Sequence, residues 1–259
     1  MSAEGLDALG RERRGAVLII TVDRQHRRNA LDPETIVALS TLLTEATADR
    51  GTSVVVLTAA GTESFGSGMD LHALAANRER AGEAVRALNA IMRSPDRLPL
   101  VAAVNGSAMA GGFELMMRCD IAVAAEHARF GLPEASRGLL AGGGATLLPC
   151  RIPLAVALEI GMTGEPIDAT RAWQLGLVNH VVPSGEVVDR AVALATRIAD
   201  NAPLAVAALR RTMWTAAIDG GTAAWEQTQA EQQVVGSSDD AREGIAAFRE
   251  KRRPRWSGT

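Results

Sequence analysis

Residues 103–120 read AVNGSAMAGGFELMMRCD, and the pattern of these residues indicates the class of fold. A short apolar run, Leu100–Val104, leads into it, and glycines follow at positions 106, 111 and 112. From Gly111 the pattern becomes helical and continues through Met117. An apolar strand, a glycine turn and a helix in succession predict one unit of an α/β fold. Because such a turn lacks bulky side chains, a ligand oxygen can approach its backbone N–H groups closely.

The sequence on either side continues this alternation. Asp32 is a candidate N-cap for a helix that starts at Pro33. A second glycine turn, Phe65–Leu71, follows an apolar strand. The predicted strands are Ala16–Val22, Ser53–Thr58, Leu100–Val104 and Asp120–Ala125, and Asn77–Arg93 has a helical pattern. Beyond Pro203 the chain is almost wholly helical, so we predict a core over residues 1–200 and a helical region over residues 201–259.

Composition limits the kind of protein this is. The 259 residues are 47% hydrophobic but only 3% aromatic, so aliphatic side chains must fill a sizeable core. A net charge of −3 gives no support for nucleic-acid binding. The N-terminus has no apolar signal core, and no segment approaches the roughly 18 apolar residues of a membrane span. These features predict a soluble cytoplasmic protein.

Two glutamates lie beside glycine-rich backbone. Glu114 closes the first glycine turn, and Glu134 follows Pro133 twenty positions later. Two carboxylates can act on one water molecule as acid and base. Glu114 could instead form a structural salt bridge with Arg118 or Arg137, and Glu134 could be a simple helix cap. Spacing alone does not decide between these alternatives.

Other motifs give weaker signals. The chain lacks a G-x-S-x-G serine-hydrolase elbow, and Gly142-Gly143-Gly144 is not followed by a glycine at dinucleotide-binding spacing. Two cysteines are too few for a disulfide framework. The four histidines are scattered, so we predict no metal site. The basic run from Arg249 to Arg255 is either a solvated tail or a contact for an anion such as phosphate.

The chain resembles the enoyl-CoA hydratase/isomerase (crotonase) family across nearly its full length. The stretches that carry the resemblance are Arg28–Leu31, Phe65–Leu71, Ala103–Asp120, Phe130–Glu134, Met162–Glu165, Gly176–Asn179 and Ala247–Arg252. The resemblance implies an α/β fold, a crotonase-like spiral of ββα turns with two roughly perpendicular sheets. It also implies a C-terminal helical region that drives assembly into a homotrimer or a dimer of trimers. Family members bind acyl-CoA thioesters without a metal or redox cofactor.

The resemblance also assigns roles to residues. By position, Glu114 and Glu134 match the catalytic glutamates of the hydratases, and the backbone N–H groups of Ser67 and Gly111 match the oxyanion hole. The positions matching contacts to substrate or coenzyme A are Arg28, Ala30, Ser67, Gly68, Met69, Asp70, Gly111, Phe248 and Lys251. This chain departs from the family pattern in three places: Ser67 replaces alanine, Ala110 replaces the first glycine of a triplet, and Ala141–Pro149 lacks the common proline-glycine and arginine features.

We therefore predict an enoyl-CoA hydratase that adds water to trans-2-enoyl-CoA in fatty acid β-oxidation or related acyl-CoA catabolism. Another reaction of the same family, double-bond isomerisation or a carnitinyl-CoA dehydratase-like reaction, is the nearest alternative. A non-catalytic acyl-CoA-binding protein is an alternative from another class.

Overall fold

The computed structural model describes residues 7–259, without the side chains of Leu71, Leu74, Ala75, Arg78 and Ile91. Residues 1–6 lie outside the described residues. Two sequence predictions concern them: that the core domain starts at residue 1, and that the N-terminus carries no apolar signal segment. The chain divides into two compact units, and the boundary along the sequence lies between Ala195 and Thr196.

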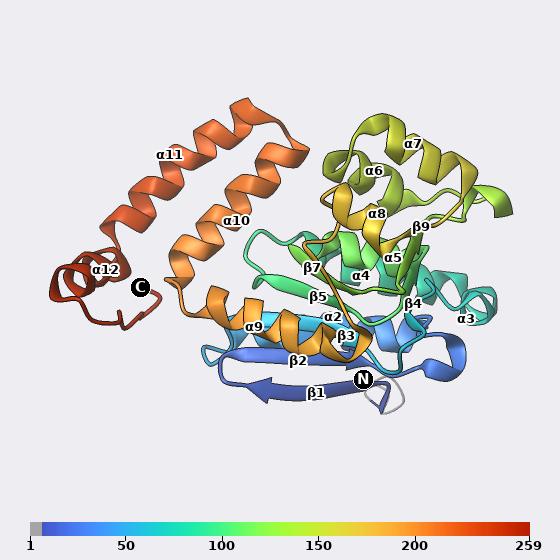
Figure 1. The fold of residues 1–259 in the computed structure, drawn as a ribbon, viewed down its shortest axis with the longest axis horizontal. Helices are drawn as coiled ribbons and strands as arrows, with labels where there is room; N and C mark the ends of the chain where they lie inside the picture. The colour runs from blue at the N-terminus through green and yellow to red at the C-terminus, as the bar shows by residue number, and fades with distance from the viewer. Residues whose placement is uncertain (1–6) are drawn as a thin grey trace. The chain divides into compact units, whose positions relative to one another are not determined.

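The first unit contains a six-stranded sheet (Figure 1). Its strand order is β1-β2-β3-β5-β7-β10, and only the β1–β2 pair is antiparallel. Every residue of β3 and β5 is buried, as expected for central parallel strands that are covered on both faces. The strands are β1 (Leu9–Arg14), β2 (Val17–Val22), β3 (Val54–Ala59), β5 (Leu100–Val104), β7 (Ile121–Ala125) and β10 (His180–Val182).

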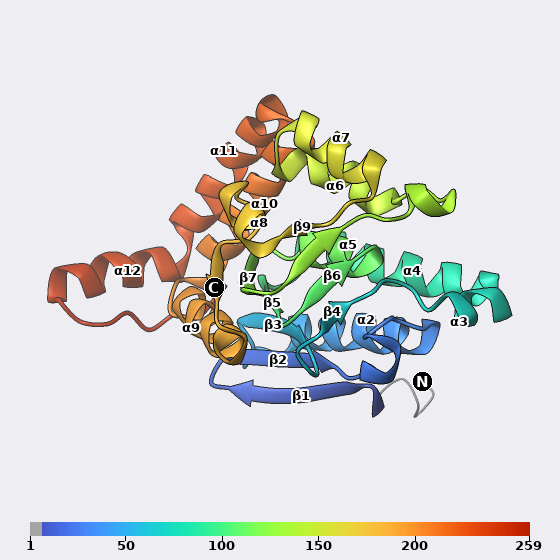
Figure 2. The same cartoon turned by 45° about the vertical axis from the view of Figure 1, so that its right-hand side comes forward.

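A second sheet of four short strands has the order β4-β6-β8-β9. In Figure 2, β4, β6 and β9 are seen one above another. The strands are β4 (Ser64–Gly66), β6 (Ser107–Met109), β8 (Arg129–Gly131) and β9 (Ile167–Asp168). Each of β4, β6 and β8 follows a strand of the larger sheet and precedes helical chain, so successive ββα turns wind from one sheet to the other. This arrangement confirms the predicted α/β fold with two sheets.

Helices complete the first unit. Asp32 caps α2 as predicted, because its side-chain oxygen accepts a hydrogen bond from the Thr35 N–H at 2.8 Å. The helices α2 and α4 contact each other. The helices are α2 (Pro33–Ala48), α3 (Leu71–Ala76), α4 (Arg78–Arg93), α5 (Gly111–Arg118), α6 (Gly142–Arg151), α7 (Leu154–Thr163), α8 (Ala169–Gln174) and α9 (Val187–Ala199), with single turns η1 (Gln25–Arg27), η2 (Ala135–Arg137) and η3 (Ser184–Glu186).

Two phenylalanines connect the elements that carry the glutamates. Phe113 of α5 and Phe130 of β8 are fully buried, with ring centroids 5.7 Å apart and planes inclined by 52°. Such a tilted aromatic pair contributes about 0.5–1.5 kcal/mol beyond its burial. It packs the helix that carries Glu114 against the strand that leads to Glu134.

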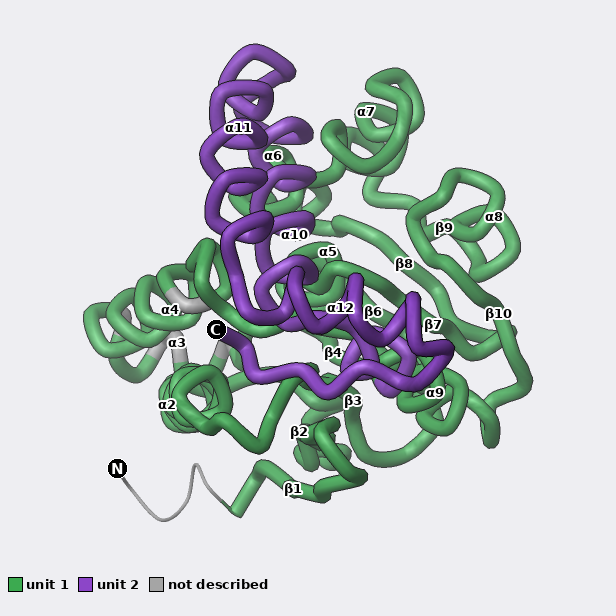
Figure 3. Tube along the Cα trace, turned by 90° about the vertical axis from the view of Figure 1, so that its left-hand side faces the viewer, with its two compact units in different colours: residues 1–195 green, residues 196–259 purple. Residues whose placement is uncertain are grey.

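The second unit, coloured purple in Figure 3, is helical. Its helices are α10 (Pro203–Ile218), α11 (Gly221–Ser237) and α12 (Asp239–Glu250). Arg211 of α10 donates two hydrogen bonds of 2.7 Å to the carboxylate of Glu231 on α11. The boundary predicted near residue 200 falls in the loop between α9 and α10, whereas the compact unit begins slightly earlier, within α9. The role of this region in assembly stays a prediction.

Among the described residues, no single helix is long and apolar enough to cross a membrane. Only the broken helical segments 184–199 and 203–218, taken together, reach the required length and apolarity.

Candidate active site

The carboxylate of Glu114 is held by the backbone of another helix. Glu114 lies in the first turn of α5 and is partly buried. The Gly144 N–H, in the first turn of α6, donates a hydrogen bond of 2.7 Å to Glu114 Oε1. An added Cβ at Gly143 would lie only 3.0 Å from the same carboxylate. The partner found for Glu114 is therefore a glycine amide, and the two arginines considered from the sequence are not needed to explain its burial.

Glu134 lies in a different environment. It is partly buried after β8, and its Oε2 atom is buried with no hydrogen-bond partner in the described structure. Burial raises the pKa of the Glu134 carboxyl above its usual 4.5, and the negative charge of Glu114 raises it further. Although Glu134 precedes the turn η2, its side chain makes no capping hydrogen bond, so the simple-cap interpretation is wrong. The two glutamates are thus close enough to interact electrostatically.

The two glycine turns meet backbone to backbone. An added Cβ at Gly112 would lie 2.2 Å from the Gly66 carbonyl oxygen, and one at Gly68 would lie 3.1 Å from the Gly111 nitrogen. Only glycine permits these approaches. Within residues 7–259, neither the Ser67 N–H nor the Gly111 N–H donates an intramolecular hydrogen bond. Two neighbouring turns therefore present free amide donors, as an oxyanion hole requires.

Ala110 adopts a backbone conformation that suits glycine. Its φ is 51° and its ψ is −130°, and its N–H donates to the Gly131 carbonyl at 3.0 Å. A side chain in such a region costs on the order of 1–3 kcal/mol and persists only where the surroundings impose it. Because Ala110 directly precedes Gly111, this conformation sets the direction of the Gly111 amide.

The predicted coenzyme A loops are joined to each other. The Leu31 N–H donates to the Gly68 carbonyl at 2.8 Å, and the Asp70 N–H donates to the Leu31 carbonyl at 2.9 Å. Ala30 and Gly68 are buried, Met69 is partly exposed, and Arg28 is exposed. Arg28 is therefore the side chain in this segment that is open to an anionic ligand.

Asp70 has structural partners. Its Oδ1 accepts a hydrogen bond from the His72 N–H at 3.0 Å at the start of α3, and its Oδ2 lies 3.4 Å from Nη2 of Arg24. Arg24 Nη2 also lies 2.7 Å from Asp32. Arg24 is buried and also donates to the Ala30 carbonyl. Sequence reasoning missed Arg24, since nothing in the pattern distinguishes it from the neighbouring surface arginines.

Phe248 and Lys251 belong to the second unit. Phe248 is 86% exposed on α12, and Lys251 is exposed with a φ of 52° at the end of that helix. Ser67, Gly111, Glu114 and Glu134 all lie in the first unit. A binding role for the two C-terminal residues stays a prediction. In the described part of the chain, no three His, Cys, Asp or Glu side chains are grouped to hold a metal ion.

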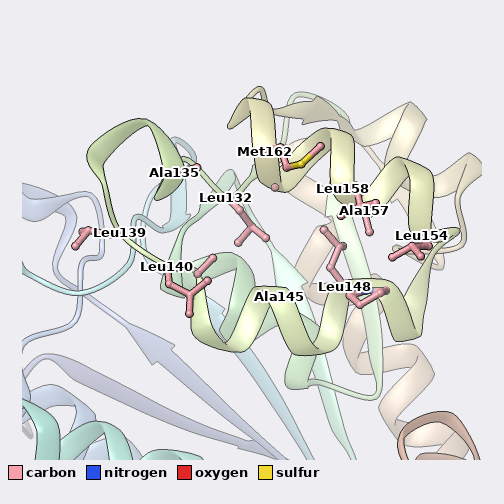
Figure 4. A pocket seen from close by; sticks show the side chains of 14 residues that line it. Leu132, Ala135, Leu139, Leu140, Ala145, Leu148, Leu154, Ala157, Leu158 and Met162 are labelled. Carbon is pink, nitrogen blue, oxygen red and sulfur yellow. The ribbon is translucent and has the colours of Figure 1, made fainter.

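An apolar cavity of about 250 Å³ lies between α6 and α7 (Figure 4). Leu132 and Leu148 contribute to its buried wall, and Leu140 and Met162 are among its exposed lining residues. Gly144, whose amide holds Glu114, also lines it.

The two-sheet fold agrees with comparison to known proteins. The chain belongs to the enoyl-CoA hydratase/isomerase family, whose sequence model matches residues 12–259. It is 39% identical to enoyl-CoA hydratase EchA19 of Mycobacterium tuberculosis, with 97% of both chains covered. It is 36% identical to carnitinyl-CoA dehydratase of Escherichia coli K12, covering 97% of this chain and 99% of that protein.

Solved structures give the same family. An enoyl-CoA hydratase from Mycobacterium tuberculosis H37Rv matches with a TM-score of 0.88 and 39% identity, over 97% of this chain and 99% of that one. An enoyl-CoA hydratase from Bacillus anthracis matches with a TM-score of 0.90 and 32% identity, over 97% of this chain and all of that one. The predicted crotonase fold is confirmed. Similar identity to a hydratase and a dehydratase leaves the individual reaction open.

Proposed function

We propose that this protein is an enoyl-CoA hydratase, which adds water reversibly across the 2,3 double bond of a trans-2-enoyl-CoA. The product is a 3-hydroxyacyl-CoA. One observation carries the proposal: two carboxyls that interact with each other have different surroundings, and backbone amides without an internal hydrogen-bond partner among the described residues lie nearby. Glu114 accepts a hydrogen bond from Gly144, whereas Glu134 has a buried unpartnered oxygen and a raised pKa.

Unequal environments favour different roles for the two groups. Glu114, as the carboxylate, removes a proton from water while the water oxygen bonds to C3. Glu134, whose raised pKa favours the protonated form, delivers a proton to C2. The electron pair of the double bond passes through an enolate before C2 is protonated, so negative charge collects on the thioester oxygen.

The amides of Ser67 and Gly111 are the proposed donors to that oxygen. Removing one such donor typically lowers the rate about 10²–10³-fold. After one turnover Glu114 holds the proton taken from water and Glu134 has lost one. A proton must then return from Glu114 to Glu134, directly or through solvent, before the next cycle. Dehydration is the same path in reverse.

The alternatives differ in what they ask of the glutamates. Isomerisation of a double bond requires only one suitable carboxylate, and simple binding of acyl-CoA requires neither. Two carboxyls in distinct environments therefore favour hydration. A carnitinyl-CoA dehydratase-like reaction would use the same two groups, so the acyl substituent distinguishes it.

We further propose that the reaction uses no metal or redox cofactor, since general acid–base groups suffice for the addition of water. The proposed setting is cytoplasmic fatty acid β-oxidation or related acyl-CoA catabolism. The proposed assembly is a homotrimer or a dimer of trimers.

Crotonyl-CoA is the test substrate, because hydration removes the absorbance of its conjugated thioester. We expect turnover by the wild-type protein, and Glu114→Gln to lower kcat about 10²–10⁴-fold with little change in acyl-CoA binding. Glu45→Gln, on the exposed face of α2, is the matched control and should retain activity. Full activity of Glu114→Gln would refute the assignment, and binding without wild-type turnover would favour the acyl-CoA-binding alternative.

A further inference from the structure

The cavity between α6 and α7 has a closed apolar floor. Leu132, Leu148 and Ala157 line it and are each less than a tenth exposed. The rim is open, with Leu140 81% and Met162 70% exposed. Aliphatic side chains around an unfilled void lack dispersion contacts on that side. An apolar group that fills the void supplies these contacts and stabilises the protein.

The lining specifies the chemistry of the occupant. Every lining residue in the described part of the chain is aliphatic, methionine, proline or glycine. A quaternary ammonium group is held in proteins by aromatic faces or by carboxylates, and neither lines this cavity. The cavity therefore suits an uncharged hydrocarbon.

The lining of the cavity includes residues that lie next to the proposed catalytic groups. Gly144 lines the cavity and also donates its N–H to Glu114. Ala135, which directly follows Glu134, lines it as well. The first turn of α6 and the segment after Glu134 thus belong both to the lining of the cavity and to the surroundings of the proposed catalytic carboxyls.

We propose that this cavity binds the hydrocarbon end of the acyl group and selects uncharged medium-length or branched chains over short or charged ones. The inference rests on the proposed function in that it takes an acyl thioester as the ligand. The alternative occupant is a second copy of the chain, which would cover the exposed rim residues Leu140 and Met162.

The volume sets the expected chain length. An engineered apolar cavity of about 150 Å³ binds benzene, so 250 Å³ corresponds to about ten carbon atoms. Each methylene buried should improve affinity about fourfold until the cavity is full. We expect the Kd of saturated acyl-CoAs to fall from butyryl-CoA to decanoyl-CoA on this scale.

Two substitutions fill the cavity from opposite helices. An added Cβ at Gly161 in α7 meets no atom within 4 Å, so Gly161→Leu places a leucine in open space at a helical position that tolerates it. Ala145→Leu enters from α6. Gly236→Leu in α11 is the matched control, since Gly236 also has no atom within 4 Å of an added Cβ and does not line the cavity.

Binding is measured by titration calorimetry with butyryl-CoA and decanoyl-CoA, and the native mass is measured in parallel. We expect Gly161→Leu and Ala145→Leu to weaken decanoyl-CoA binding at least tenfold and butyryl-CoA binding less than twofold, while Gly236→Leu changes neither. An unchanged length dependence in both filling variants would overturn the proposal. If in that case their native mass changes as well, a second copy covers the groove.

The two proposals fail separately. Saturated acyl-CoAs bind without turnover, so the cavity assignment holds if their length dependence is found in a protein that does not hydrate crotonyl-CoA. Conversely, hydration of crotonyl-CoA with no preference among chain lengths would support the proposed reaction and overturn the cavity assignment.

Discussion

Glu134 places a carboxyl oxygen out of water without a compensating hydrogen bond. Burying such a group opposes ionisation, which is the physical cause of its raised pKa. The same feature that suits Glu134 to the proposed role of proton donor therefore lowers the stability of the folded chain at neutral pH. Activity and stability are opposed at this one residue.

Substitution of Glu134 should separate the two properties. The folded state binds the Glu134 proton more tightly than the unfolded state does, so stability falls as pH rises from about 4.5 through the raised pKa of the folded protein. Glu134→Gln should raise Tm at pH 7–8, give no gain near pH 4, and lower kcat about 10²–10⁴-fold. Thermal unfolding across this pH range tests it, with Glu45→Gln as the control. A lower Tm at pH 8 would contradict the assigned environment.

The strained backbone of Ala110 leads to a second prediction for a single residue. Glycine relieves its φ of 51° but raises the entropy of the unfolded chain, so Ala110→Gly should stabilise the protein by about 1 kcal/mol. The exposed Ala193 inside α9 is the control, because Ala193→Gly should destabilise by about 1 kcal/mol. Urea unfolding measures both. Equal destabilisation by the two substitutions would show that Ala110 carries no strain.

Among the elements, the loops at residues 28–32 and 68–70 depend on Arg24. The buried guanidinium of Arg24, at the start of η1, lies between Asp32 and Asp70, which precede α2 and α3. These loops flank Ser67, so their packing bears on the direction of its amide. Arg24 is a positioning residue on this account, because it acts on the site through the loops.

Asp70→Asn tests the connection, because the amide keeps the oxygen that caps α3 and loses the charge facing Arg24. We expect a loss of about 1.5–3 kcal/mol in the free energy of unfolding and a lower kcat at nearly constant KM for crotonyl-CoA. Asp189, 78% exposed and paired with Arg14, is the control, since Asp189→Asn should cost less than about 1 kcal/mol. Loss of stability with kcat unchanged would make the network structural only.

The elements also show where sequence reasoning reaches its limit. The continuous apolar run Leu100–Val104 predicted β5 with the same bounds, and Asp32 with Pro33 predicted the start of α2. The strand β1 was missed because all but one of its residues are exposed and four are charged. Strands of two or three residues, such as β6 and β9, are too short for an alternation to be recognised.

The candidate site was predictable to a similar extent. Family resemblance supplied Glu114 and Glu134, and the glycines predicted backbone donors nearby. The bond from Gly144 to Glu114 joins residues 30 positions apart through a main-chain amide, which carries no side-chain signal. The burial of Arg24 likewise depends on two segments, residues 30–32 and the loop around Asp70, that meet only in the folded chain.

The second unit exposes large apolar side chains on helices that no other element of that unit covers. They are Leu209, Met213, Ile218, Trp225, Val234, Ile245 and Phe248, each about half exposed or more. We expect association of chains to bury this surface, so the native mass of the wild-type protein should be a multiple of 27.2 kDa. Trp225→Glu should reduce the native mass to 27.2 kDa, because the new carboxylate would be buried without a partner at the contact. Light scattering after size exclusion measures the mass. Trp173 on α8 of the first unit is 56% exposed, against 67% for Trp225, and Trp173→Glu should leave the mass unchanged. A wild-type protein that elutes as a monomer at micromolar concentration would remove the predicted assembly role of residues 201–259.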